Sequence, residues 1–595
     1  MSTPTSSTPR RTAPRRTART GSARRTLLAV SSRSAVSSRS AVSALAALSA
    51  LALTLTACSG TAHPGGAGGA SGTGAAYRLT ARTPASAGGL DSFTWSLFAE
   101  PTSIDYAYSF DYPPNTVLAN VCESLLRWNP DLTTSPGLAS AVASPTPTTW
   151  VYTIRGGVHF HDGTVLTADD VVASLRRNLD PNVGSDWAYP YRNVKSVDKT
   201  GPMQVTVTLN TPDSTFNKYM AASPGTVESA ATLRSDGKDY GNPSKGVNCT
   251  GPFAFSSWTP GQSLVLTRFD GYWDPSLRAR SKQVKFVFLS DATARVNAFR
   301  TGEVDGGWMV PPDSYAQLAS SSAGRLYYGQ NTTVADEVVG NLKGVLGSAD
   351  VRRALLMAID RKGIIKAGVA GVGDVADSLV TRNNWNGSLS GGSLDAVLKA
   401  LPAYPYDPPK ARRLAAKAGV AGQKVVIATS PLDSQTTIIT QAVAQAATAI
   451  GLKPEIDTIS SDKYTALFTD PAARKGVDLF LTFWYTSITD PLDMYGSLRT
   501  GAFSNYGNWS NPQFDAAVNQ AVGSADPAAR AAAAAKAQQI AMDQLPWLPL
   551  YTEPVSVFLG KRITGVQPSI DYLYYPWAAE IGAQGSGSQG TGAQG

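Results

Sequence analysis

Alternating hydrophobic and polar positions predict a series of β-strands from about residue 150 onward. At 150–154 the alternation places Trp150, Tyr152 and Ile154 on one face, and residues 204–209 repeat the pattern. A period of two residues is typical of a strand with one buried face. Further strands are expected at 284–289, 424–429 and 478–484.

Helical spacing separates these strands. Thr167 followed by Asp170 is a capping pair, and Val171, Val172, Leu175 and Leu179 then recur at the spacing of one helix face. Acidic N-caps are expected at Asp350, Asp407 and Asp526, and a proline follows the last two. Strands and helices in alternation predict a mixed α/β protein of several lobes, and no internal repeat is visible in the sequence.

The longest apolar run, residues 41–57, lies near the N-terminus. It ends in Leu55-Thr56-Ala57-Cys58, and the residues before Cys58 carry nine arginines and no acid. This is the layout of a lipoprotein signal, because the run is short for a spanning helix and small residues precede the cysteine. We therefore expect a signal peptide at 1–57 and a lipid on Cys58 that holds the protein at the outer face of the cell membrane. The general and the twin-arginine export routes both fit this segment.

Removal of the signal changes the charge balance. The whole chain is formally +8, and subtracting the nine arginines leaves −1 from Cys58 onward. The basic character thus belongs to the removed segment, which excludes nucleic acid as a partner. Residues 58–76 and 586–595 are rich in Gly, Ala, Ser and Thr and are expected to be a tether and a disordered tail.

Candidate chemistry is sparse. The sequence has no nucleophile elbow, zinc-protease motif or phosphate loop. His159 and His161 stand at strand spacing and could share a metal, but Asp162-Gly163 follows at once, so we interpret this segment as a turn. Cys122 and Cys249 are the two cysteines left after lipidation. In an oxidising compartment a disulfide is favoured over two free thiols.

A series of motifs gives the strongest indication of function. The segments are, in order, Cys122 to Leu126 with Leu138-Ala139, Ile154 to Gly163 leading to Val171, Thr250 to Phe253, Gly271 to Trp273, Gly302 to Asp305, Val351 to Asp360, Tyr406 to Pro408, Asp490-Pro491, Pro512 to Asp515 and Leu545 to Tyr551. In this order they resemble the extracytoplasmic solute-binding proteins of peptide-type ABC importers, family 5. The resemblance extends from about residue 91 to residue 576.

The resemblance implies a two-lobed periplasmic-binding-protein fold of type II with an extra third domain and a cleft that closes by a hinge. The implied boundaries are 77–122, 246–330 and 546–585 for the first lobe, 123–245 for the extra domain and 331–545 for the second lobe. On this map Cys122 and Cys249 lie at the two chain crossings between the first lobe and the extra domain. A bridge between them would brace the crossings.

The resemblance also implies that the protein is a monomeric receptor and not an enzyme. It would capture a small solute between the lobes and deliver it to the permease subunits of an ABC importer, without cofactor or metal. A ligand sensor has the same sequence features, whereas a secreted hydrolase lacks its catalytic set here.

Ligand identity is less defined by the resemblance. Peptide-binding relatives carry Trp-x-x-Asp before the Asp-Pro step, and this aspartate pairs with the peptide ammonium group. Here Trp484 is followed by Ser487 at the aspartate position. A hydroxyl cannot neutralise a buried ammonium, so either another acid binds a peptide or the ligand is neutral, such as an oligosaccharide stacked on aromatic rings. Tyr112, Trp308, Trp484 and Ser487 are the expected ligand contacts, and core packing is the alternative for the two tryptophans.

Overall fold

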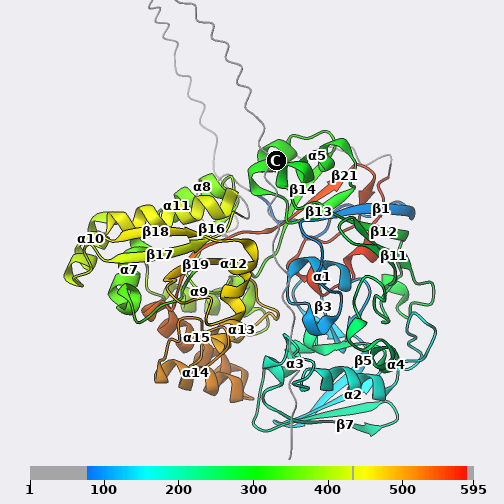
Figure 1. The fold of residues 1–595 in the computed structure, drawn as a ribbon. Helices are drawn as coiled ribbons and strands as arrows, with labels where there is room; N and C mark the ends of the chain where they lie inside the picture. The colour runs from blue at the N-terminus through cyan, green and yellow to red at the C-terminus, as the bar shows by residue number, and fades with distance from the viewer. Residues whose placement is uncertain (1–76, 432–433, 586–595) are drawn as a thin grey trace, which may run out of the picture. The chain divides into compact units, whose positions relative to one another are not determined.

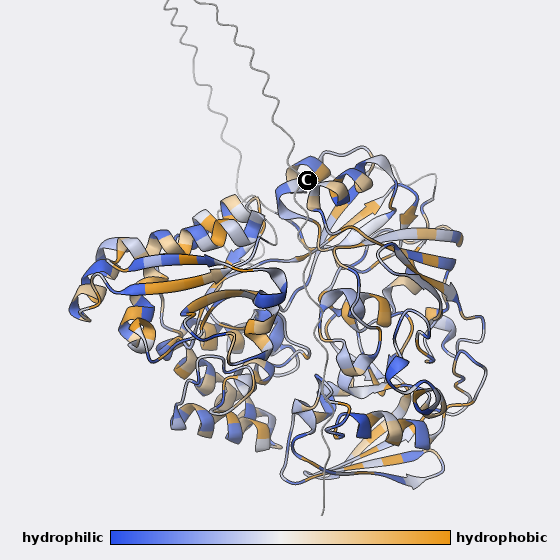
Figure 2. Ribbon diagram, in the orientation of Figure 1, coloured by the Kyte–Doolittle hydropathy of each residue, from blue (hydrophilic) through white to orange (hydrophobic). Residues whose placement is uncertain are grey.

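The computed structural model describes residues 77–431 and 434–585 (Figure 1). The predicted signal peptide, the lipidation site Cys58, the tether and the tail 586–595 lie outside the described residues. Within this part of the chain no helix is long and apolar enough to span a bilayer. Three β-sheets of four or more strands organise it, and apolar residues concentrate in their strands (Figure 2).

A seven-stranded sheet forms the core of the first lobe. Its order is β10 (Phe253–Thr259), β11 (Ser263–Arg268), β12 (Ser281–Phe288), β1 (Leu90–Leu97), β13 (Gly306–Trp308), β21 (Val555–Gly560) and β14 (Gly324–Gly329). The strand β1 runs parallel to both β12 and β13, and the other pairs are antiparallel. Helices α5 (Ala292–Thr301) and α6 (Tyr315–Ala319) follow β12 and β13. Asp291 caps α5 by accepting from the Ala294 amide at 2.7 Å.

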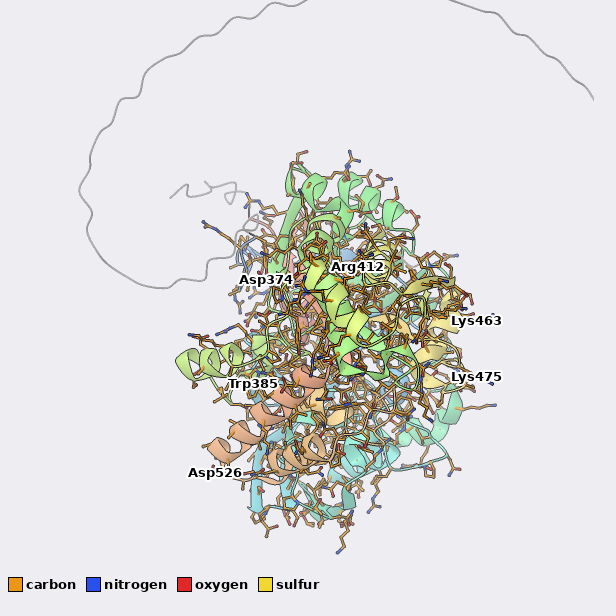
Figure 3. All side chains as sticks on the ribbon, turned by 90° about the vertical axis from the view of Figure 1, so that its left-hand side faces the viewer. Asp374, Trp385, Arg412, Lys463, Lys475 and Asp526 are labelled. Atoms are coloured by element: carbon orange, nitrogen blue, oxygen red, sulfur yellow. A yellow bond between two sulfur atoms is a disulfide. The ribbon has the colours of Figure 1, made fainter. Side chains whose placement is uncertain are left out.

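A six-stranded sheet forms the core of the second lobe. Its order is β16 (Asp374–Val375), β20 (Trp547–Thr552), β15 (Val334–Val339), β19 (Leu479–Trp484), β17 (Lys424–Thr429) and β18 (Lys453–Thr458). The helices of this lobe are α7 (Ala349–Ala358), α8 (Arg361–Gly368), α9 (Gly391–Lys399), α10 (Pro408–Lys417), α11 (Ser434–Ala449), α12 (Ser461–Thr469), α13 (Pro491–Ser497), α14 (Pro512–Gly523) and α15 (Pro527–Gln544). The fully buried Trp385 belongs to its core, and Asp526 marks the start of α15 (Figure 3).

The caps of these helices follow the predictions except at one site. Asp407 accepts from the Lys410 amide at 2.9 Å and Asp526 from the Ala529 amide at 2.6 Å. The prediction for Asp350 was wrong, because α7 begins two residues earlier with Ser348 at the N-cap. Asp350 lies in the first turn of α7 and pairs with Arg353 at 2.7 Å. Its negative charge there also interacts favourably with the positive end of the helix dipole.

A four-stranded antiparallel sheet forms the third domain. Its order is β5 (Ala139–Thr146), β6 (Thr149–Ile154), β8 (Gln204–Leu209) and β7 (Val194–Gly201), with α2 (Ala168–Arg177), α3 (Phe216–Tyr219) and α4 (Ala230–Asp236) beside it. The predicted capping box is present at the start of α2, which ends at Arg177, before the exposed Leu179. One continuous cluster of buried apolar residues joins this domain to the first lobe, whereas the second lobe has a separate core.

Two adjacent chain connections join the first and second lobes. The chain passes from β14 to β15 and returns from β20 to β21, and Val334 pairs with Thr552 where the two segments enter the second lobe. The remaining short elements are α1 (Tyr112–Leu118), β2 (Glu123–Ser124), β3 (Leu126–Trp128), β4 (Thr134–Pro136), β9 (Thr226–Val227), β22 (Ile563–Thr564) and β23 (Gly582–Ala583). Two adjacent connections allow one lobe to rotate against the other, as hinge closure requires.

Cys122 and Cys249 form a disulfide where the chain crosses between the first lobe and the third domain. Their Cα atoms are 4.9 Å apart, within the normal range for a bridge. Glu123, next to Cys122, is buried and accepts hydrogen bonds from Tyr272 at 2.9 Å and from the Trp273 indole at 2.8 Å. The crossing is therefore held both covalently and by a buried polar network.

Candidate functional site

The first and second lobes meet at the loop before α1 and the loop after β19. Tyr485 donates a hydrogen bond from its hydroxyl to the Phe110 carbonyl at 2.6 Å. Its ring centre lies 5.0 Å from that of Tyr112. Asp111 positions Tyr112 by capping α1, since its carboxylate accepts from the Tyr112 amide at 2.7 Å. Tyr112 thus lies at the seam between the lobes.

Ser487 lies two residues beyond Tyr485 and is buried. Its backbone amide donates to the Asp493 carboxylate at 2.6 Å. The preceding residue, Thr486, accepts from the Asn384 amide group at 2.5 Å, which fixes the loop on the second lobe. The structure therefore brings Tyr112 and Ser487 to the same seam. Tyr485, two residues before Ser487, makes the ring contact with Tyr112.

Asp493 was not identified from the sequence and is the main acid of this region. It lies in the first turn of α13, and its second carboxylate oxygen accepts from the Tyr219 hydroxyl of the third domain at 2.5 Å. Burial raises the pKa of Asp493 to about 6, although the bonds from Tyr219 and Ser487 oppose this effect. The negative charge of Asp493 in turn contributes to the raised pKa of Tyr189 and Tyr574, after burial, so both phenols remain neutral.

The aromatic rings around Asp493 come from different parts of the chain. Tyr189 lies edge-on to Tyr219 with ring centres 5.6 Å apart. The hydroxyl of Tyr574 is buried and has no hydrogen-bond partner among the described residues. A carboxylate lined by phenol rings is a suitable environment for a cation, which gains from the charge and from the ring faces.

The two predicted tryptophans lie in the two separate cores. Trp308 is 4% exposed and stacks on Tyr572 with ring centres 4.4 Å apart and an interplanar angle of 14°. Trp484 is half-buried, and its ring centre lies 5.3 Å from that of Trp547 in the second lobe. Neither indole nitrogen has a hydrogen-bond partner among the described residues. The structure thus does not bring these two rings together.

The histidine segment forms a turn. Gly163, with φ +86°, donates its amide to the Phe160 carbonyl at 2.9 Å, as predicted. His161 is bound through Nε2 to the Gly251 carbonyl at 3.0 Å, and burial lowers its pKa to about 4. In residues 77–431 and 434–585 no group of three or more His, Cys, Asp or Glu side chains is arranged to hold a metal ion.

Comparison with known families decides the classification. Residues 133–506, more than half of the chain, match the family described as bacterial extracellular solute-binding proteins, family 5. The chain belongs to this family. Family 5 proteins are extracytoplasmic solute-binding proteins of ABC importers, so the protein is a binding protein and not an enzyme.

Individual relatives show the same relation. The glutathione-binding protein GsiB of Escherichia coli O6:K15:H31 is 27% identical over 434 residues, which cover 70% of this chain and 80% of GsiB. Among solved structures, AgaA of A. tumefaciens R10 in complex with agropinic acid aligns with a TM-score of 0.72 at 22% identity, covering 83% of this chain and 99% of AgaA. DppA of Helicobacter pylori in complex with the peptide STSA aligns with a TM-score of 0.73 at 19% identity, covering 84% and 99%. The structural likenesses establish the two-lobed fold.

Proposed function

We propose that this protein is a lipid-anchored receptor that captures a small solute with a protonated amino group, such as a short peptide, and delivers it to an ABC permease. The signal at Cys58 and the glycine-rich segment behind it support anchoring at the outer face of the membrane. We further propose that it acts as a monomer, with lobe and domain boundaries as predicted from the resemblance. A tether raises the local concentration of the receptor near its permease.

One observation carries the proposed ligand class: a buried carboxylate at the seam, Asp493, stands beside Ser487. The missing aspartate at position 487 removes one partner for an ammonium group. Asp493 supplies a carboxylate that accepts a hydrogen bond from the Ser487 backbone amide at 2.6 Å. A buried ammonium needs a charged or strongly polar partner, because an unpaired charge costs several kcal/mol.

The ligands of two of these relatives agree with this chemistry. Glutathione and the peptide STSA, named for GsiB and DppA, both carry a free amino group. The phenols of Tyr219 and Tyr189 would cover the apolar part of such a ligand next to its charge. A neutral oligosaccharide can donate hydrogen bonds to a carboxylate but brings no positive charge to pair with it. Binding of such a sugar is therefore the outcome that would contradict the proposal.

Calorimetry with paired peptides tests it directly. We expect short peptides with a free amino terminus to bind about 10- to 100-fold more tightly than the same peptides acetylated at the amino terminus, because a lost charged hydrogen bond is worth about 1.5–3 kcal/mol. Asp493→Asn should abolish this preference. The matched control is Asp395→Asn, which removes an exposed carboxylate paired with Arg382 in the same lobe. Equal binding of free and acetylated peptides by the wild type would overturn the ligand class.

A further inference from the structure

The short helix α3 connects the third domain to the second lobe through two consecutive side chains. Lys218 binds the Asp490 carboxylate through its ammonium group at 2.6 Å, and Tyr219 binds Asp493 at 2.5 Å. Both acids belong to the N-terminal end of α13 (α3 and α13 in Figure 1). One turn of the third domain thus holds two acids of the opposite lobe.

Asp490 is the buried centre of this contact. Its side chain is 0% exposed and interacts with Lys218 from the third domain and with Arg530 from α15 of the second lobe. It also caps α13 by accepting from the Leu492 amide at 2.9 Å. Burial alone would raise the pKa of Asp490, but the charge of Lys218 and then that of Arg530 outweigh it and hold the pKa below its ordinary value.

Neighbouring hydrogen bonds cross the same seam. Arg530 donates from Nε to the Ser214 hydroxyl at 2.8 Å, and the Ser214 amide donates to the Val522 carbonyl at 2.8 Å. Thr489 donates from its hydroxyl to the Leu132 carbonyl at 3.1 Å. A cavity of about 350 Å³, lined by Lys218, Arg530, Ser214 and others, lies beside these bonds. The contact is therefore polar, it borders a cavity, and its Lys218 side chain is 30% exposed.

The two cationic side chains that pair with Asp490 behave differently when the hinge opens. Arg530 and Asp490 lie in one lobe, so this pair persists when the lobes separate and keeps the carboxylate neutralised. Lys218 lies in the third domain, whose apolar core is continuous with that of the first lobe. Opening of the hinge must therefore break the pair of Lys218 with Asp490, and closing must form it.

We propose that α3 is a latch by which the third domain closes on the second lobe, and that Lys218 is a positioning residue that sets the population of the closed form. Lys218 would strengthen solute capture through closure rather than by contact with the solute, because a ligand's apparent affinity scales with the fraction of protein in the competent form. This proposal does not depend on the identity of the ligand.

Hydrogen exchange of the ligand-free, full-length protein tests the latch. The variants are Lys218→Met, which keeps the aliphatic stem, and Lys218→Arg, which keeps the charge. The control is Lys199→Met, which removes a 41% exposed lysine paired with Asp169 inside the third domain. We expect Lys218→Met to speed exchange of the Ser214 amide by about fivefold, which corresponds to about 1 kcal/mol for the loss of a partly exposed ion pair. Lys218→Arg should restore protection, and Lys199→Met should leave it unchanged.

Two readouts distinguish a latch from a structural support. If Lys218→Met also speeds exchange throughout β7 and β8, the residue stabilises the third domain itself and the proposal is wrong. Unchanged exchange at Ser214 would equally overturn it. Small-angle X-ray scattering should show a larger radius of gyration for ligand-free Lys218→Met than for wild type and Lys199→Met, and equal radii would contradict the population shift.

Discussion

Asp493→Asn removes the buried carboxylate beside Ser487 and should change the pH dependence of stability. The carboxyl pKa is about 6 in the folded protein, against an ordinary value of 3.8. Because the fold favours the protonated form, the stabilising contribution is fully present below about pH 4 and is lost as the pH rises through 6. The rise of about two in the pKa corresponds to roughly 3 kcal/mol.

The ionisable groups that interact with Asp493 do not titrate in this range. Burial raises the pKa of Tyr189 and Tyr219 well above the ordinary value, so both remain neutral. Asp490 stays ionised because Lys218 and Arg530 lower its pKa despite its burial. The pH dependence between 4 and 7 that distinguishes the variant from the wild type should therefore belong to Asp493.

Chemical denaturation at a series of pH values measures this effect. The unfolding free energy of the wild type minus that of Asp493→Asn should fall by about 3 kcal/mol between pH 4 and pH 7. The same difference for Asp395→Asn, an exposed carboxylate, should stay nearly flat. A flat curve for Asp493→Asn as well would refute our account of the buried acid. A cationic ligand reverses the trend, and its affinity should rise with pH across the same interval.

Other predictions concern the cysteines and Ser487. Replacing Cys122 and Cys249 together by alanine removes a bridge between residues 127 positions apart in sequence. The loss should lower the unfolding free energy by about 5 kcal/mol, measured by denaturation without reductant. A loss under 1 kcal/mol would contradict a bracing role. Cys58→Ala should release the protein from membranes in fractionation, and quantitative retention without the signal peptide would refute lipidation. Ser487→Asp places a second carboxylate beside Asp493 and should destabilise the protein at pH 7 by about 3 kcal/mol, for an effective dielectric constant of 20 and a separation near 5 Å. Acidification to pH 5 should relieve this loss, and an equal loss at both pH values would contradict charge repulsion.

The local elements were largely predictable because their signals are contiguous in sequence. The strand at 424–429 is observed at Lys424–Thr429, and that at 478–484 is observed at Leu479–Trp484. The helix starts at Asp407 and Asp526 are marked by a cap and a proline within two residues. Asp350 failed because Ser348 is an equally good cap, and sequence alone does not decide between two caps two residues apart.

The chemistry at the seam was harder to predict. The hydrogen bond from Tyr219 to Asp493 joins residues 274 positions apart, so no short motif encodes it. The available signal was the pair of acids Asp490 and Asp493 after Trp484. Such a pair also occurs at an ordinary helix start, so it does not by itself indicate a binding site. Trp308 shows the opposite difficulty, since a tryptophan at a strand end suits a binding surface and a core equally, and here it stacks on Tyr572.

The central claim is that the seam between the lobes captures a small solute with a protonated amino group. Mass spectrometry of the solute released from natively purified protein by denaturation tests this most directly. We predict a solute with a free amino group, such as a short peptide, present at close to one equivalent in the wild type and depleted in Asp493→Asn. A neutral sugar, or an amine-bearing solute retained equally by Asp493→Asn, would contradict the account.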